Sequence, residues 1–141
     1  MFVIGMEVVQ TARRYKGTPF QHQGRRIGMG VDCAGLLIGV ARDLGLSEYD
    51  IDGYPRVPDG KTLQAILRAE MVPIKSDEVR PGDVLLFGFY RHAQHLAIVT
   101  RVEPIYIIHS YQPNDAVVEH RLDSVWRQRV RGYYRFPGVH I

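Results

Sequence analysis

Apolar side chains recur at helical spacing in the first half of the chain and in short, nearly continuous runs in the second half. The segments 6–16, 32–46 and 61–71 place apolar residues three or four positions apart, which predicts three amphipathic helices. The middle segment has the broadest apolar face, formed by Leu36, Leu37, Val40, Ala41 and Leu44. We therefore expect this helix to lie in the core.

The pattern changes after Pro73. Five segments are typical of strands: 84–89, 95–102, 105–110, 116–120 and 129–136. Helices followed by strands indicate an α+β fold, with the N-terminal helices packed on an antiparallel sheet of about five strands. The sequence contains no internal repeat or linker, so we predict that residues 1–141 form one domain.

The composition is that of an ordinary globular protein, with 45% hydrophobic and 23% charged residues. No segment approaches the roughly 20 apolar residues of a membrane span, so we expect none. The apolar run Met1–Glu7 is short and lacks a basic leader. These features predict cytoplasmic synthesis without a secretory signal, so action outside the cell would need another route of delivery.

The net charge is +3, and five arginines crowd near the C-terminus: Arg121, Arg127, Arg129, Arg131 and Arg135. Such a cluster could attract an anionic polymer such as nucleic acid or cell wall. Alternate arginines on an edge strand can also stay in solvent and block edge pairing. The basic residues do not belong to a recognisable nucleic-acid module with interleaved aromatic residues, so we predict no nucleic-acid partner.

Cys33 is the only cysteine, which excludes an internal disulfide. It follows Asp32, a good N-cap, and therefore stands at the predicted start of the core helix. A helix N-terminus favours the thiolate, which is the nucleophilic form of cysteine. The alternative is an inert, buried thiol.

Two histidines provide candidate partners for Cys33. His95 opens one predicted strand and His109 closes the next, so an antiparallel hairpin would bring both rings to the same rim of the sheet. A Cys-His-His arrangement of this kind supports acyl transfer by a thiol nucleophile, with one histidine as base and the other as its orienting group.

Other interpretations of these histidines remain open. Each could be a surface side chain, or Cys33, His95 and His109 could bind zinc, although paired ligand spacings are missing and we predict no metal. The other four histidines are expected to be non-catalytic: His22, His92, His120 and His140. His22 lies in the loop that leads to Cys33 and could reach the site.

The order of motifs resembles the NlpC/P60 family of cysteine peptidases, particularly its phage and prophage branch. The resemblance covers nearly the whole chain, and it rests on segments 12–24, 28–37, 80–84, 94–99, 107–110 and 117–137. It implies a papain-like fold in circularly rearranged order. It also implies Cys33 as nucleophile, His95 as base and His109 as orienting residue.

The resemblance extends to substrate binding. It implies that Asp32 helps to hold a free amine of the substrate, besides its role as N-cap. Phe20 stands where the family often has a tyrosine, whose hydroxyl near the nucleophile is absent here. Ala34 stands where the family often has a serine, so a polar contact with the peptide stem is lost. We include Phe20 and His22 with Asp32 as candidate substrate-binding residues.

The implied substrate is a stem peptide of bacterial peptidoglycan, cut between D-glutamate and the diamino acid, and no cofactor is needed. The phage-type resemblance further implies a virion- or tail-associated enzyme that works with phage tail-tip proteins. Two rival hypotheses remain. One is a tail-assembly or wall-binding module with a vestigial site, and the other is a papain-like amidase or acyltransferase on another substrate.

Overall fold

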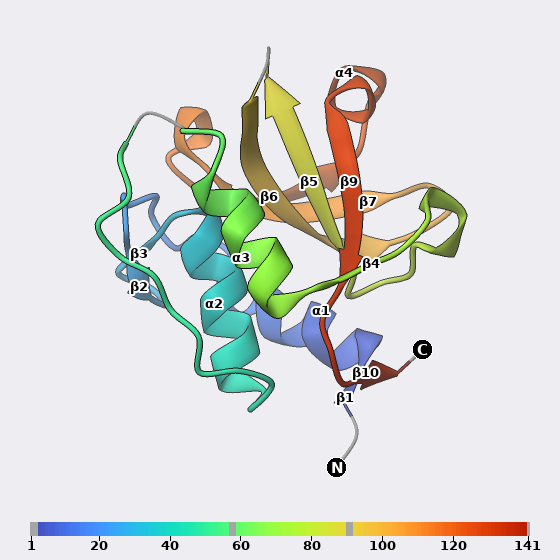
Figure 1. Cartoon of the computed structure of the whole chain (residues 1–141), viewed down its shortest axis with the longest axis horizontal. Helices are drawn as coiled ribbons and strands as arrows, with labels where there is room; N and C mark the ends of the chain where they lie inside the picture. The colour runs from blue at the N-terminus through green and yellow to red at the C-terminus, as the bar shows by residue number, and fades with distance from the viewer. Residues whose placement is uncertain (1–2, 57–58, 90–91, 141) are drawn as a thin grey trace.

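The computed structural model describes residues 3–56, 59–89 and 92–140. Its helices pack on a central β-sheet (Figure 1). The main sheet has six strands in the order β4-β9-β5-β6-β7-β8, all paired antiparallel. Their bounds are β4 (Val72–Pro73), β5 (Val84–Phe89), β6 (His92–Arg101), β7 (Tyr106–Tyr111), β8 (Ala116–Arg121) and β9 (Val130–Arg135).

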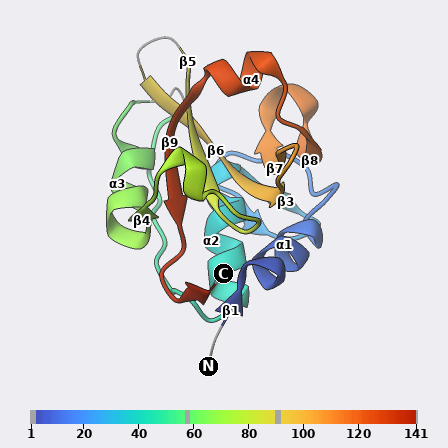
Figure 2. The same ribbon diagram turned by 90° about the vertical axis from the view of Figure 1, so that its right-hand side faces the viewer.

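Four α-helices accompany the sheet: α1 (Gly5–Arg13), α2 (Cys33–Asp43), α3 (Thr62–Glu70) and α4 (Ser124–Gln128). Short 3-10 helices span Ser76–Glu78 and Gln112–Asn114. Two small two-stranded sheets complete the fold, one pairing β1 (Val3–Ile4) with β10 (Val139–His140) and the other pairing β2 (Arg25–Arg26) with β3 (Gly30–Val31). Strands β1 and β10, from opposite ends of the described chain, lie side by side at the end of the molecule opposite α4 (Figures 1 and 2).

The sheet has a hydrophobic core on each face. Helices α1, α2 and α3 pack on one face, where the fully buried Leu36 and Leu37 meet Leu96 and Ile98 of the sheet. On the other face, Trp126 of α4 packs on a second apolar cluster. Burying each such leucine or isoleucine contributes about 1.5–3 kcal/mol, so α2 is fixed firmly against the sheet.

Two polar contacts tie the elements together. Tyr15, just after α1, lies against Gly39 of α2, and its hydroxyl donates to Asp43 at 2.8 Å. The buried Asp83, in the turn before β5, accepts two 2.8 Å hydrogen bonds from the Arg135 guanidinium on β9. A bidentate pair of this type fixes the direction of β9 beside β5.

The α+β prediction is confirmed, and each of the three predicted helices and five predicted strands forms close to its expected bounds. The sheet has a sixth strand, β4, which the sequence did not indicate because it is only two residues long and contains Pro73. Helix α4 was also missed. In the described ranges, no helix is long and apolar enough to cross a bilayer.

Candidate active site

Cys33 is the first residue of α2, and the helix is capped as the sequence predicts. The Asp32 carboxylate accepts a 2.7 Å hydrogen bond from the Gly35 backbone N–H. The residues that follow Cys33 are buried in the core on successive turns of α2, so the thiol has a rigid support.

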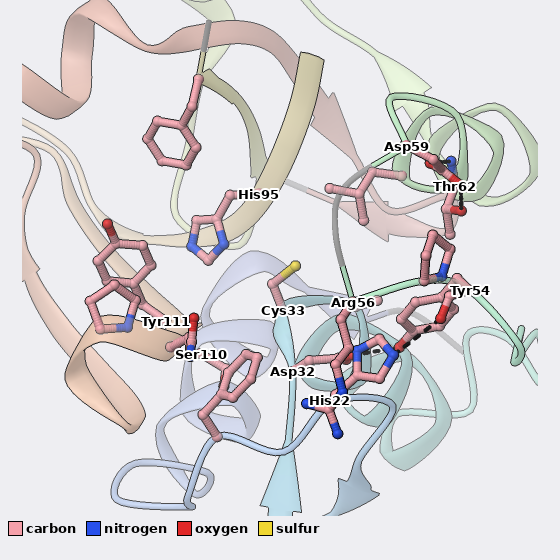
Figure 3. Close-up of a pocket in the computed structure, with 17 residues that line it drawn as sticks. His22, Asp32, Cys33, Tyr54, Arg56, Asp59, Thr62, His95, Ser110 and Tyr111 are labelled. Atoms are coloured by element: carbon pink, nitrogen blue, oxygen red, sulfur yellow. Dashed lines mark hydrogen bonds between the residues drawn. The ribbon is translucent and has the colours of Figure 1, made fainter.

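Cys33 lines a cleft of about 340 Å³. The start of α2, residues in the segments 54–56 and 59–63, His95 of β6 and the ends of β5 and β7 line this cleft, and the side chains of Phe20, His22 and Asp32 contribute to its wall. In Figure 3 the side chains of Cys33 and His95 lie next to one another, and both line the cleft. The structure thus brings together the proposed nucleophile and base.

His95 and His109 lie on neighbouring antiparallel strands, β6 and β7, whose register sets Ile98 opposite Ile108. Nε2 of His95 lies 2.5 Å from Nδ1 of His109, and the two side chains are 5% and 0% exposed. The other nitrogen of His95, Nδ1, is therefore the one available to a partner in the cleft. The prediction that the two histidine rings lie close together on the sheet is therefore confirmed.

A third histidine extends this pair. Nε2 of His109 lies 2.8 Å from Nε2 of His120 on β8, and Nδ1 of His120 lies 2.9 Å from the backbone oxygen of Arg121. The Trp126 ring packs edge-on against His109, with ring centroids 5.1 Å apart, and Tyr111 stacks on its face at 5.4 Å. Sequence reasoning set His120 aside and did not consider Trp126 at all.

Burial sets the protonation of the thiol and the imidazoles. It raises the pKa of Cys33 to about 12, and the neighbouring Asp32 carboxylate adds to the increase. It lowers the pKa of His95 to about 3 and, together with the neighbouring histidines, that of His109 to about 2. Backbone N–H groups at the helix start, those of Cys33 and Ala34, act to lower the thiol pKa as the sequence predicts, but desolvation and Asp32 outweigh them. At neutral pH the resting groups are a thiol and neutral imidazoles.

Asp32 is the centre of a hydrogen-bond network. Besides Gly35, its carboxylate accepts hydrogen bonds from the Gln23 backbone N–H at 2.8 Å and the Tyr54 hydroxyl at 2.5 Å. The guanidinium of Arg25 forms an ion pair with it at 3.3 Å. Both oxygens are thus occupied by the protein, and the side chain is almost fully buried. Tyr54, from the opposite wall of the cleft, carries no sequence signal that would have revealed it.

His22 and Phe20 both lie at the cleft. Nε2 of His22 is 3.1 Å from the Tyr54 carbonyl oxygen, which also accepts from the Gln23 side chain at 2.8 Å. His22 therefore braces the segment around Tyr54 (Figure 3). Phe20 adds a half-buried aromatic ring to the wall without a polar contact.

Two further histidines are not among the described residues that line the cleft. His140 is exposed on β10, and the side chain of His92 lies outside the described part of the chain. Among the described side chains, no group of three or more histidine, cysteine or acidic residues has a geometry that could hold a metal ion.

A cysteine at the start of a core helix, beside a histidine on the adjoining antiparallel sheet, is the arrangement of papain-like α+β proteins. The sequence comparison is more specific. The model of the NlpC/P60 family matches residues 17–135, and the chain belongs to the NlpC/P60 family.

Solved structures with the same architecture include several NlpC/P60 proteins. The NlpC/P60 domain of the peptidoglycan hydrolase SagA is 26% identical over 93% of this chain and 97% of that domain, with a TM-score of 0.63. A Staphylococcus aureus protein described as similar to a lipoprotein of the NLP/P60 family is 21% identical, with a TM-score of 0.67 over 97% of this chain and 42% of that protein.

The peptidoglycan hydrolase RipB from Mycobacterium tuberculosis is 17% identical, with a TM-score of 0.62 over 93% of this chain and 63% of that protein. The chain thus spans less than half of the Staphylococcus aureus protein and under two thirds of RipB, but nearly all of the SagA domain. A comparison with curated protein sequences gave no significant match.

Proposed function

We propose that this protein is a cysteine peptidase that hydrolyses amide bonds in the stem peptides of bacterial peptidoglycan. The observation that carries the proposal is that Cys33 and His95 line the same cleft as neighbours, with His95 hydrogen-bonded to the buried His109. Membership of the NlpC/P60 family and similarity to the SagA hydrolase domain support peptidoglycan as the substrate.

In the proposed mechanism, the substrate carbonyl sits beside Cys33 at the N-terminus of α2. Nδ1 of His95 takes the thiol proton as the sulfur attacks the carbonyl carbon, since both groups are neutral at rest. The backbone N–H of Cys33 is the natural donor to the oxyanion at this helix start. His95 then gives its proton to the departing amine, which leaves a thioester on Cys33. Water, deprotonated by His95, hydrolyses the thioester and regenerates the thiol.

His109 holds His95 in position in this scheme. Its Nδ1 accepts the hydrogen bond from Nε2–H of His95, which leaves Nδ1 of His95 free to act as the base. Because His109 is completely buried between Tyr111 and Trp126, its own ring has little freedom to turn. This is the orienting role of the third member of a triad.

The three candidate substrate-binding residues would contribute differently. Phe20 offers an apolar wall, and His22 holds the segment around Tyr54 in place. The network around Asp32 supports a structural role first, because an incoming amine would compete with four protein partners for its oxygens. Recognition of the amine by Asp32 therefore requires displacement of at least one of them.

The finer details of the proposal rest on the resemblance of the sequence to the phage branch. They are cleavage between D-glutamate and the diamino acid, and a place in a phage or prophage tail with delivery by the virion.

An inactive wall-binding module is the main rival. An acyltransferase on lipid would need an exposed apolar surface. Phe87 is fully buried, Phe89 lines the cleft, and Tyr90 lies outside the described residues.

The test is digestion of purified sacculi, with the soluble products identified by mass spectrometry. Wild type should release fragments that begin with the free amine of the diamino acid, and Cys33→Ala should release none. A chelator should leave the wild-type rate unchanged. If correctly folded wild type releases no fragments, the proposed function is wrong. Equal release by Cys33→Ala would assign the activity to a contaminant or to other residues.

A further inference from the structure

The pair His95–His109 belongs to a longer chain of hydrogen bonds that runs across three strands. On β7 and β8, Ile107 lies opposite His120 and His109 lies opposite Val118, so His109 and His120 are diagonal neighbours on one face of the sheet. Diagonal neighbours of this kind are within reach of aromatic side chains. The chain of contacts runs from His95 to His109, then to His120, and ends at the backbone oxygen of Arg121.

The last hydrogen bond of this series fixes which nitrogen of His120 donates and which accepts. A backbone carbonyl can only accept a hydrogen bond, so Nδ1 of His120 must carry a proton and donate to Arg121. In neutral His120, Nε2 is then an acceptor. A neutral imidazole has one donor and one acceptor nitrogen, and each ring in the chain passes this constraint to the next.

The constraint can be followed back to the cleft. His109 must donate from Nε2 to His120, and its Nδ1 must then accept from His95. His95 must donate from Nε2, which leaves the lone pair of its Nδ1 directed toward the cleft. The opposite polarity would put a proton on Nδ1 of His95, and that ring could not take the proton of the thiol.

His109 cannot fix this polarity alone. Both of its ring nitrogens contact other histidines, and its side chain has no exposure to solvent that could supply water as an alternative partner. The pair His95–His109 satisfies its mutual hydrogen bond equally well in either direction. The asymmetry comes from outside the pair, through His120.

We propose that His120 is a positioning residue that sets the tautomers of His109 and His95 through the carbonyl of Arg121. The catalytic consequence rests on the proposed function, whereas the tautomers themselves do not. Trp126, whose ring centroid lies 6.0 Å from that of His120 and 5.1 Å from that of His109, packs along both rings and keeps them in register.

The first test is nitrogen NMR of protein labelled with ¹⁵N-histidine, recorded at pH 8, with each ring assigned by single substitution. His95 and His109 should be protonated on Nε2, and His120 on Nδ1. In His120→Leu, the signal of His109 should shift toward a mixture of tautomers. Protonation of His109 on Nδ1 in wild type, or an unchanged tautomer in His120→Leu, would overturn the proposal. This readout is valid even if the protein does not cleave peptidoglycan.

The second test is steady-state kinetics on purified stem peptide with a matched pair of variants. His120→Leu removes the acceptor, and we expect kcat to fall about fivefold with KM within about twofold, because one hydrogen bond is worth about 1 kcal/mol and His120 does not line the cleft. His120→Gln should restore most of kcat, because its amide oxygen can accept from His109 and its amide N–H can donate to Arg121. Equal losses in both variants would indicate packing alone and would overturn the proposal, as would wild-type kcat in His120→Leu.

Discussion

The buried histidine pair should make the fold sensitive to mild acid. Burial lowers the pKa of His95 to about 3 and that of His109 to about 2, so both rings stay neutral in the folded protein at pH 5. In the unfolded chain both rings regain the ordinary histidine pKa of 6.5. Below that pH the unfolded state binds more protons than the folded state, so stability is complete above about pH 7 and falls as the pH decreases.

The size of the effect follows from these values. Between pH 7 and pH 5, each histidine should lower the free energy of unfolding by about 2 kcal/mol, and the pair by about 4 kcal/mol. The carboxylates act in a lower range. Although burial opposes it, hydrogen bonds from Arg13 and Lys16 lower the pKa of Glu119 to about 2, so its contribution is lost only below its usual value of 4.5.

The assay is urea unfolding at pH 7, 6 and 5. Trp126, the only tryptophan, lies against the histidines and provides the fluorescence signal. His109→Gln should lose only about 2 kcal/mol between pH 7 and pH 5, half of the wild-type loss. A wild-type stability that does not change over this range, or an unchanged loss in His109→Gln, would refute the reasoning.

Two further predictions concern the same site. Because burial lowers the pKa of His95, kcat/KM on stem peptide should stay constant between pH 7.5 and 5.5 and fall only well below pH 6.5. A decrease in kcat/KM centred at pH 6.5 would contradict the burial argument. Asp32→Ala loses the helix cap and the partner of Arg25, whereas Asp32→Asn can keep the cap, so the asparagine variant should be more stable by about 1 kcal/mol in urea unfolding. Equal stabilities would show that the cap contributes nothing.

The helices and main strands could be predicted because local pattern and tertiary packing agree. Asp32 caps α2 through its side chain, and the apolar stripe after it packs on the sheet as the spacing indicates. Helix α4 was missed because it has only five residues, too few for a periodic pattern. Its one signal was Asp123, whose side chain accepts from the Trp126 backbone N–H.

The site could be predicted only in part, because its geometry depends on register and burial. The ends of β6 and β7 could be paired from the sequence, and that pairing brings His95 to His109. The place of His120 depends on the β7–β8 register, which no short motif specifies. The raised pKa of Cys33 depends on desolvation, which a helix-terminus argument does not include.

The most direct test of the central claim is to look for the thioester on Cys33. Wild type is quenched in acid during turnover of purified stem peptide, and its own peptides are then mapped by mass spectrometry. The account predicts an acyl group from the substrate on the peptide that contains Cys33, and neither adduct nor products with Cys33→Ala. Product formation at an undiminished rate by Cys33→Ala, without an adduct in wild type, would contradict it.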